Sequence, residues 1–264
     1  MPDTPNPNEP KITAVMLCYG RKALAEEAVE SFLRQTYMRK RLLIVNTHPD
    51  RVWFEDEYPN IEVHNIHPDP FKNLNEKYNY AFDQIRTPWW CPWDSDDIWL
   101  PWHMANFFGG IPREKKSPLP WKIGLKKCYF SEDNVIDRVG WNMWTNYMYE
   151  TFDWKGDRYP RCDSTKPEDN CDRQILFTKW DRVWLTESRR SFIFRWSQAP
   201  HGSAYPGEDG LAYQAHCRQK MYAIRNSEPL RPHWERDYIQ DVEDFDKGLK
   251  RTSTQRQEAQ AHED

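Results

Sequence analysis

Residues 89–97 read WWCPWDSDD, an apolar run that passes directly into three aspartates. The run is short and shows no polar alternation, so it predicts a β-strand that is buried on both faces. Asp94, Asp96 and Asp97 follow in the loop after that strand. Ligands of parallel α/β sheets bind beyond the carboxyl ends of the strands, so this loop is the first place to expect a functional site.

The sequence before this stretch alternates between strand and helix patterns. Residues 12–18 and 42–45 are apolar runs, and residues 61–66 alternate like a strand. Apolar side chains at helical spacing predict amphipathic helices over residues 24–33 and 74–85. The polar side of the first helix carries Glu26, Glu27, Glu30 and Arg34. This order of elements predicts an α/β, Rossmann-like fold with a mostly parallel central sheet flanked by helices.

A chain of 264 residues fits one large domain. We expect a flexible N-terminus over residues 1–10, a single domain over 11–246 and a solvated tail over 247–264. Within the domain, residues 11–110 carry the strand and helix pattern, and residues 111–246 form an elaborated C-terminal region. Strands and long loops are expected up to about residue 190, then a strand over 191–196 and a helix over 210–221.

Composition excludes several classes of protein. The net charge of −4 argues against a general nucleic-acid binder, which needs a surplus of lysine and arginine. The six cysteines form no CxxC pair, which disfavours a zinc module or a disulfide scaffold and predicts buried thiols. The sequence contains neither a run of about 18 apolar residues nor a signal-peptide pattern, so we expect a cytoplasmic protein without a membrane span.

The three aspartates suggest a cation site. Holding like charges this close is costly unless a cation or solvent compensates them, and hard carboxylate ligands favour Mg²⁺ or Mn²⁺. Such an ion could bridge to a diphosphate. In an extended segment Asp94 and Asp96 would face one site and Asp97 another.

Two stretches resemble the family-two type glycosyltransferases with the GT-A fold. Residues 31–37 (SFLRQTY) are similar to that family's SxxxQTY helix end, and residues 94–97 (DSDD) to its Asp-x-Asp motif. The resemblance runs from Lys11 to about Pro101. It implies a GT-A-like sheet, a nucleoside-diphosphate sugar as donor, a metal ion on Asp96, and contact of Asp94 with the ribose or the donor sugar. Residues 11–110 would then bind the nucleotide sugar and residues 111–246 the acceptor.

A second match lies downstream. Residues 206–211 (PGEDGL) are similar to the family's GED element, which implies Asp209 as catalytic base and Glu208 as a residue that orients or binds the acceptor. A helix N-terminus favours the ionised carboxylate that a base requires. By the same resemblance His233 is a candidate metal ligand, with His201 as its competitor.

The donor site has further candidates and two departures from the family pattern. Asn46 stands where members usually carry an acid that grips the base or ribose, and the first loop reads Tyr19-Gly20-Arg21, with Arg21 as a diphosphate contact. Lys72 and Asn73 precede the second helix, where a helix start can hold an anionic donor. Pro92 within the motif strand predicts an interrupted ladder.

These residues combine into an inverting, metal-assisted transfer from a UDP-sugar, in the manner of a hexosyltransferase, to an acceptor hydroxyl. The acceptor is open between a carbohydrate, another hydroxyl compound and, as a minority alternative, a modified nucleic-acid base. Candidate stacking residues are Trp141, Trp144, Tyr147 and Trp154, and candidate phosphate contacts are Arg189, Arg190 and Arg195. A metal-dependent phosphohydrolase or nucleotidyltransferase and a non-catalytic sugar-binding relative stay open, as does the oligomeric state.

Overall fold

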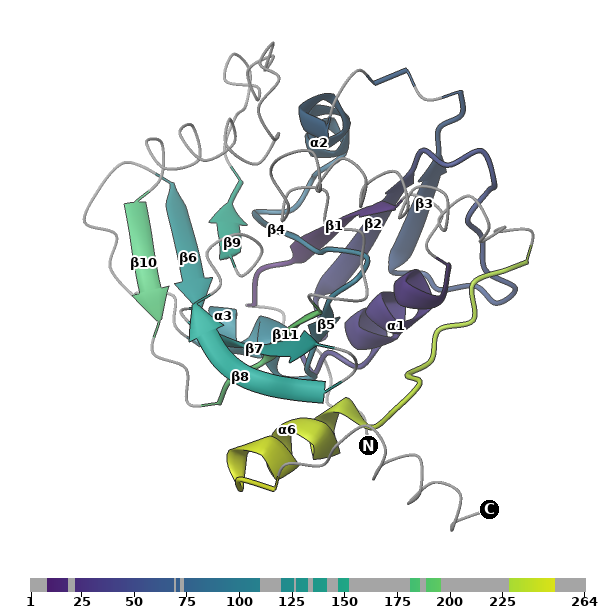
Figure 1. The fold of residues 1–264 in the computed structure, drawn as a ribbon. Coiled ribbons are helices and arrows are strands. Elements are labelled where there is room, and N and C mark those ends of the chain that lie inside the picture. Colours follow the sequence, from purple (N-terminus) through teal and green to yellow (C-terminus); the bar gives the residue numbers. More distant parts are fainter. Residues whose placement is uncertain are drawn as a thin grey trace, which may run out of the picture.

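A seven-stranded sheet forms the centre of the molecule (Figure 1). In sheet order its strands are β10 (Asp181–Leu185), β6 (Trp121–Leu125), β9 (Tyr147–Glu150), β4 (Trp89–Pro92), β1 (Ile12–Cys18), β2 (Lys40–Asn46) and β3 (Ile61–Asn65). The computed structural model describes residues 9–18, 22–68, 70–71, 74–109, 120–125, 127–132, 135–141, 147–151, 181–185, 189–195 and 228–249. None of the helices in these ranges is long and apolar enough to span a membrane.

The four strands of the N-terminal half are parallel, as the sequence predicts. β1 pairs with β2 on one side and with β4 on the other, and β2 pairs with β3. The apolar residues of β1 and β2 are almost all buried, in agreement with strands that are covered on both faces. The predicted α/β class and its mostly parallel sheet are therefore confirmed.

Two helices cover opposite faces of the parallel strands. α1 (Lys22–Leu33) packs through Phe32 and its small apolar residues against alternate residues of β1, including Ala14 and Met16. α2 (Leu74–Asp83) packs through Phe82 in the cluster that contains Val15. Neighbouring residues of a strand point to opposite faces, so the two helices lie on different sides of the sheet.

The C-terminal half extends this sheet and adds a second one. β9 enters the large sheet antiparallel to both β4 and β6, and β10 runs parallel to β6. The second sheet has the order β5 (Ile98–Trp99), β11 (Phe192–Arg195), β7 (Lys127–Glu132) and β8 (Val135–Trp141). α3 (His103–Gly109) follows β5 directly. The strands expected between residues 112 and 196 are thus present, in an arrangement that their sequence pattern does not specify.

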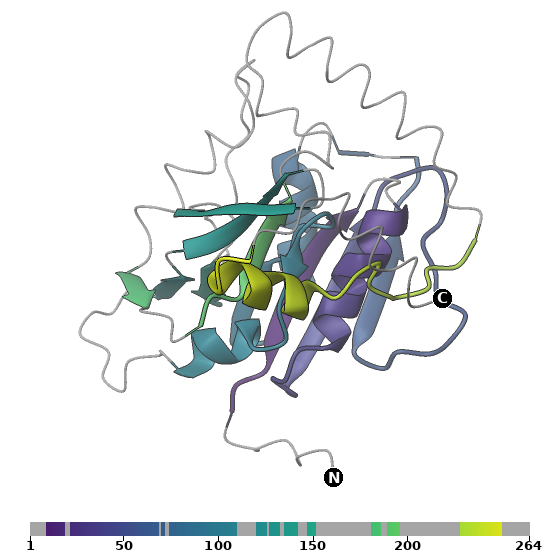
Figure 2. The ribbon, with the colours of Figure 1, turned by 60° about the horizontal axis from the view of Figure 1, so that its bottom comes forward.

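A C-terminal helix closes the second sheet. α6 (Tyr238–Asp246) begins at Asp237, whose carboxylate accepts hydrogen bonds from the N–H groups of Ile239 and Gln240 at 3.0 Å each. Its apolar side chains Tyr238 and Val242 pack with residues of β5, β7, β8 and β11. An extended segment leads into α6 along the outside of α1 (Figures 1 and 2). We call residues 228–237 the C-terminal strap.

The tryptophans of the described core fill space. Trp90, Trp93 and Trp99 are among the largest fully buried side chains, and the ring centroids of Trp93 and Trp99 lie 3.9 Å apart. Trp53 is an exception, with an exposed fraction of 44%. Cys18, Cys91 and Cys128 are buried thiols, as predicted.

Candidate active site

The acidic motif lies at the carboxyl end of β4, beside the ends of β1 and β2. Trp93 N–H donates to Val15 O at 2.8 Å, and the pairing of β4 with β1 continues through Pro92. The prediction that Pro92 interrupts the ladder is therefore wrong on the β1 side. Towards β9 the pairing covers only Trp89 and Trp90. Residues 94–97 then form a turn, with Asp97 N–H directed at Asp94 O at 3.4 Å.

Asp97 faces the protein interior. Its Oδ1 accepts a hydrogen bond from the backbone N–H of Arg195 at 3.1 Å, and its side chain is fully buried. Burial raises the pKa of Asp97 well above its usual range, and the carboxylates of Asp96 and Asp94 raise it further. The three acids therefore repel one another, which is the condition that a bound cation relieves.

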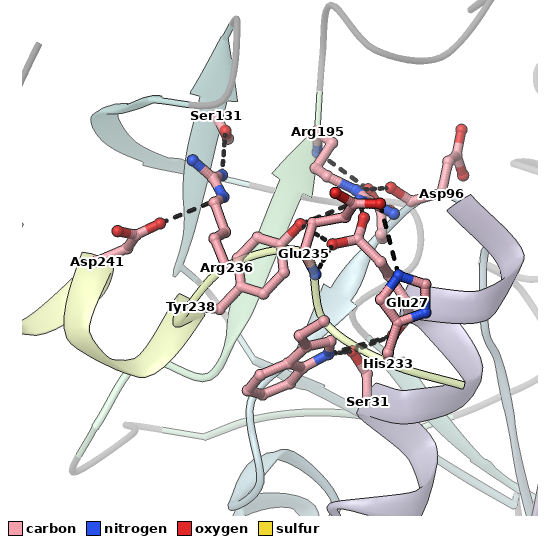
Figure 3. Close-up of polar contacts among 12 residues, drawn as sticks. Glu27, Ser31, Asp96, Ser131, Arg195, His233, Glu235, Arg236, Tyr238 and Asp241 are labelled. Atoms are coloured by element: carbon pink, nitrogen blue, oxygen red, sulfur yellow. Dashed lines mark hydrogen bonds and ion pairs between the residues drawn. The ribbon is translucent and has the colours of Figure 1, made fainter. Parts of the chain in front are cut away.

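Asp96 is held through its backbone. Its carbonyl accepts a hydrogen bond from Arg195 Nε, while its side chain points away from that guanidinium (Figure 3). Asp96 is 6% exposed and Asp94 is half-buried. Asp97 therefore points into the protein interior, whereas Asp94 and Asp96 lie at the carboxyl end of β4.

The SFLRQTY stretch has a structural role beside this motif. Gln35, at the end of α1, donates from Nε2 to the carbonyls of Trp99 and Leu100 at 3.2 and 2.9 Å, and its Oε1 accepts from Met104 N–H at 2.9 Å. Thr36 N–H donates to Pro101 O at 2.8 Å. These bonds tie the end of α1 to the chain that leaves the acidic motif.

Glu27 of α1 is the centre of a buried polar network (Figure 3). Its carboxylate forms an ion pair with Arg195 Nη1 and accepts hydrogen bonds from Tyr238 Oη at 2.7 Å and Glu235 N–H at 3.1 Å. Arg195 is fully buried, so it cannot serve as the exposed phosphate contact that the sequence suggested. Sequence reasoning missed Glu27 and Tyr238, since each falls on an ordinary amphipathic helix pattern.

The strap is fastened to α1 along its length. Arg231 N–H donates to Glu26 Oε1 at 2.8 Å, and Trp234 Nε1 donates to Glu27 O and Ser31 Oγ at 3.2 and 3.1 Å. As a result Glu26 and Glu27, which the amphipathic pattern places on the polar side of the helix, are both buried.

His233 lies on this strap between two anchored positions. Its Nδ1 is 2.7 Å from Arg231 O and its Nε2 is 3.5 Å from Glu235 Oε1, with the side chain 49% exposed. The hydrogen bond to the Arg231 carbonyl raises the pKa of His233. When Nδ1–H donates to a carbonyl, the neutral ring presents the Nε2 lone pair, which is the arrangement of many metal-ligating histidines.

The amide of Asn46 is committed to its own loop. Nδ2 donates to Asp50 O and Asn65 Oδ1 at 2.9 Å each, and Oδ1 accepts from His48 N–H at 3.2 Å. The residue is fully buried. Asn46 therefore shapes the loop after β2, and its side chain has no donor left for a nucleotide base.

Comparison with solved structures identifies the fold. A fragment of TarS (residues 1–349) from S. aureus, solved in complex with UDP-GlcNAc, matches with a TM-score of 0.53 at 14% identity, over 82% of this chain and 72% of that one. The whole TarS chain matches with a TM-score of 0.51 at 12% identity, over 82% of this chain and 43% of that one. The fold is of the GT-A glycosyltransferase type.

Other comparisons add less. A mannosyltransferase from Pyrobaculum calidifontis, in complex with GDP-Man and Mn²⁺, matches with a TM-score of 0.48 at 12% identity, over 85% of this chain and 67% of that one. No protein-family model and no curated protein matches the sequence. The GT-A assignment thus rests on the three-dimensional arrangement.

The described residues provide only some of the ligands that a divalent cation needs. Asp94 and Asp96 offer carboxylate oxygens, which suit Mg²⁺ or Mn²⁺, and their mutual repulsion with Asp97 favours a cation there. Among the described residues, however, no three or more His, Cys, Asp or Glu side chains are grouped so as to hold an ion. His233 is thus not joined to the acids in this arrangement.

The acceptor-side candidates divide between the core and the part outside the description. Tyr147 is buried against Tyr149 and Trp184, with Lys122 Nζ 3.8 Å from its ring centroid, so it belongs to the core. Arg189 and Arg190 pair with Glu243 and Asp246 of α6 at 3.0 and 2.6 Å. Predicted site residues outside the described part, or whose side chains are not described, are Tyr19, Arg21, Lys72, Asn73, Trp141, Trp144, Trp154, His201, Glu208 and Asp209.

Proposed function

We propose that this protein is an inverting glycosyltransferase that moves a sugar from a nucleoside-diphosphate sugar, with a UDP-sugar favoured, to an acceptor hydroxyl. The observation that carries the proposal is the crowding of Asp94, Asp96 and Asp97 at the carboxyl end of β4 in a GT-A fold. This is the sheet edge where parallel α/β proteins bind their ligands. The solved TarS fragment with UDP-GlcNAc has the same fold and supports a UDP-sugar as donor.

In the proposed site Asp96 and His233 hold a Mn²⁺ or Mg²⁺ ion. The ion, when bound, neutralises charge on the leaving nucleoside diphosphate. Asp94 contacts the ribose or donor sugar, and Arg21 lies against the diphosphate. For His233 to take part, the strap would have to bring Nε2 to the acids while Nδ1 keeps its bond to the Arg231 carbonyl.

The remaining groups complete the reaction. Asp209, at the predicted start of a helix, accepts the proton of the attacking hydroxyl, and Glu208 orients the acceptor. Tyr19, Lys72 and Asn73 contribute to the donor pocket. Because the Asn46 amide is used within its loop, we assign base recognition to the backbone and side chains around it and not to Asn46 itself.

Thermal stabilisation by nucleotides tests this function. We expect UDP or a UDP-sugar, each with Mn²⁺ and near 100 times its dissociation constant, to stabilise the protein by about 2.7 kcal/mol, or roughly 5–10 °C in Tm. Asp96→Ala should remove the part of the shift that needs Mn²⁺. Asp209→Asn should keep the shift and lose sugar transfer.

The alternatives give different results. A phosphohydrolase or nucleotidyltransferase predicts nucleotide hydrolysis or transfer that Asp209→Asn leaves unchanged. A non-catalytic relative predicts nucleotide-sugar binding that persists in Asp96→Ala. Absence of any shift across nucleotides and nucleotide sugars, with and without Mn²⁺, refutes the proposed donor class.

A further inference from the structure

A buried chain of polar contacts links the C-terminal strap to the acidic motif. It runs from the strap and Tyr238 to Glu27, from Glu27 to Arg195, and from Arg195 to the backbone of Asp96 and the carboxylate of Asp97 (Figure 3). The strap, α1, β11 and the motif are far apart in sequence. This chain brings all four into one network.

We propose that Glu27 and Arg195 are positioning residues for the acidic motif, and that docking of the strap on α1 sets the geometry of Asp96 through them. The inference rests on the proposed function, because it names what holds the cation-binding acids in place. Glu27 and Arg195 touch neither donor nor cation in this reading.

The shape of the Arg195 side chain suits this role. Nε donates to Asp96 O while Nη1 reaches both Glu27 and Tyr238, the latter at 3.2 Å, so one planar group spans the gap between motif and helix. Its backbone N–H also holds Asp97. A lysine could keep the charge beside Glu27, but a single ammonium cannot reproduce this fork.

The burial of the pair favours positioning over stability as its purpose. Arg195 and Glu27 are almost completely removed from water, and an ion pair at such a place stabilises a fold no better than apolar residues of the same size. A buried pair does, however, fix the directions of its partners. Here the partners are the Asp96 peptide and the strap.

The same contacts place His233. The strap backbone is bound to adjacent glutamates on both sides of this residue, through Arg231 N–H on Glu26 and Glu235 N–H on Glu27. Docking of the strap therefore determines at once where His233 lies and, through Arg195, how the Asp96 peptide is turned.

The test compares Mn²⁺ binding in the presence of UDP, measured from the signal of free Mn²⁺ in electron paramagnetic resonance. Variants are Arg195→Lys, Tyr238→Phe and the two combined, with Arg190→Lys as the matched control. Arg190 also pairs with α6, through Asp246, and is not part of the Glu27–Arg195 network. Folding of each variant is checked by circular dichroism and urea denaturation.

We expect Arg195→Lys to weaken Mn²⁺ binding by about tenfold or more, the usual effect of removing a group that orients a ligand. Tyr238→Phe removes one hydrogen bond to Glu27 and should weaken Mn²⁺ binding by about threefold. In the Arg195→Lys background Tyr238→Phe should have no further effect, because the link to the motif is already broken. Arg190→Lys should bind Mn²⁺ like the unchanged protein.

Two results overturn the inference. One is Mn²⁺ binding by Arg195→Lys that equals that of Arg190→Lys. The other is an undiminished effect of Tyr238→Phe in the double variant. If Arg195→Lys does not fold, Tyr238→Phe, which keeps the ion pair, decides alone: unchanged Mn²⁺ binding refutes the link. Failure of the unchanged protein to bind UDP with Mn²⁺ refutes the proposed function instead.

Discussion

Replacing Glu27 by glutamine removes the charge that faces Arg195 and should destabilise the protein by about 3–5 kcal/mol. The side chains of Glu27 and Arg195 are 5% and 0% exposed, so the guanidinium would stay buried after losing the carboxylate of its ion pair. An independent figure agrees: two unit charges about 4 Å apart at an effective dielectric constant of about 20 attract by about 4 kcal/mol. The hydrogen bonds from Tyr238 and Glu235 can pass to the glutamine carbonyl, so they change little.

A double-mutant cycle separates the pair from its surroundings. Arg195→Met removes the guanidinium, and the combination with Glu27→Gln removes both charges of the pair. We expect the double variant to be more stable than the sum of the two losses by about 2 kcal/mol. Glu30→Gln is the control, since Glu30 lies on the same helix and forms an ion pair with the half-exposed Arg34, which should cost less than about 1 kcal/mol.

The assay is equilibrium unfolding in urea, followed by tryptophan fluorescence and circular dichroism, with the free energy obtained by linear extrapolation. Comparable slopes among the variants would show that they unfold from equally compact states. A loss below about 1 kcal/mol for Glu27→Gln, or additivity within about 0.5 kcal/mol, would refute the description of this pair as a coupled, desolvated unit.

Two further predictions concern the core. A Cβ on Gly124 would lie 2.5 Å from Tyr147 Cε1 and 2.8 Å from Trp184 Cζ3, so Gly124→Ala should lower the free energy of unfolding by about 1–3 kcal/mol in the same assay, while Gly109→Ala, where a Cβ meets open space, should not. Burial holds the pKa of His103 well below its usual 6.5. As the pH falls below 6.5, His103 takes up a proton in the unfolded state but not in the folded state, so the free energy of unfolding decreases. Unfolding in urea between pH 6.5 and 5 should show this loss, up to about 1.4 kcal/mol per pH unit, in the unchanged protein and not in His103→Phe. Equal slopes in both proteins would contradict it.

The local elements of the N-terminal half follow from the sequence because their signals are local. The apolar runs of β1 and β4 and the helical spacing in α1 depend on residues that are close in the chain, and a parallel sheet follows from their order. The place of the acidic motif follows as well, since it comes directly after a buried strand. The sequence therefore predicts the sheet edge at which a ligand would bind.

Features that depend on distant partners do not follow. The antiparallel entry of β9 between β4 and β6 is set by pairing with strands that lie far from it in the chain, such as Trp89 of β4 with Glu150 and Lys122 of β6 with Tyr149. The strand pattern of residues 147–150 is the same for either direction. The amide of Asn46 is chemically suited to bind a nucleotide base, yet it forms its hydrogen bonds with Asn65 and with the loop after β2. The roles of residues outside the described part, such as Asp209, stay predictions from the sequence.

Glu27 shows most clearly which structural features the sequence does not determine by itself. Helical periodicity by itself determines that Glu26 and Glu27 lie on the polar side of α1, and this is correct. Only the tertiary structure decides that the C-terminal strap, about 200 residues later in the chain, covers that side and turns Glu27 into the buried partner of Arg195. The physical reason is that amphipathic spacing records which face of a helix is polar, whereas burial depends on whatever part of the chain finally packs against that face.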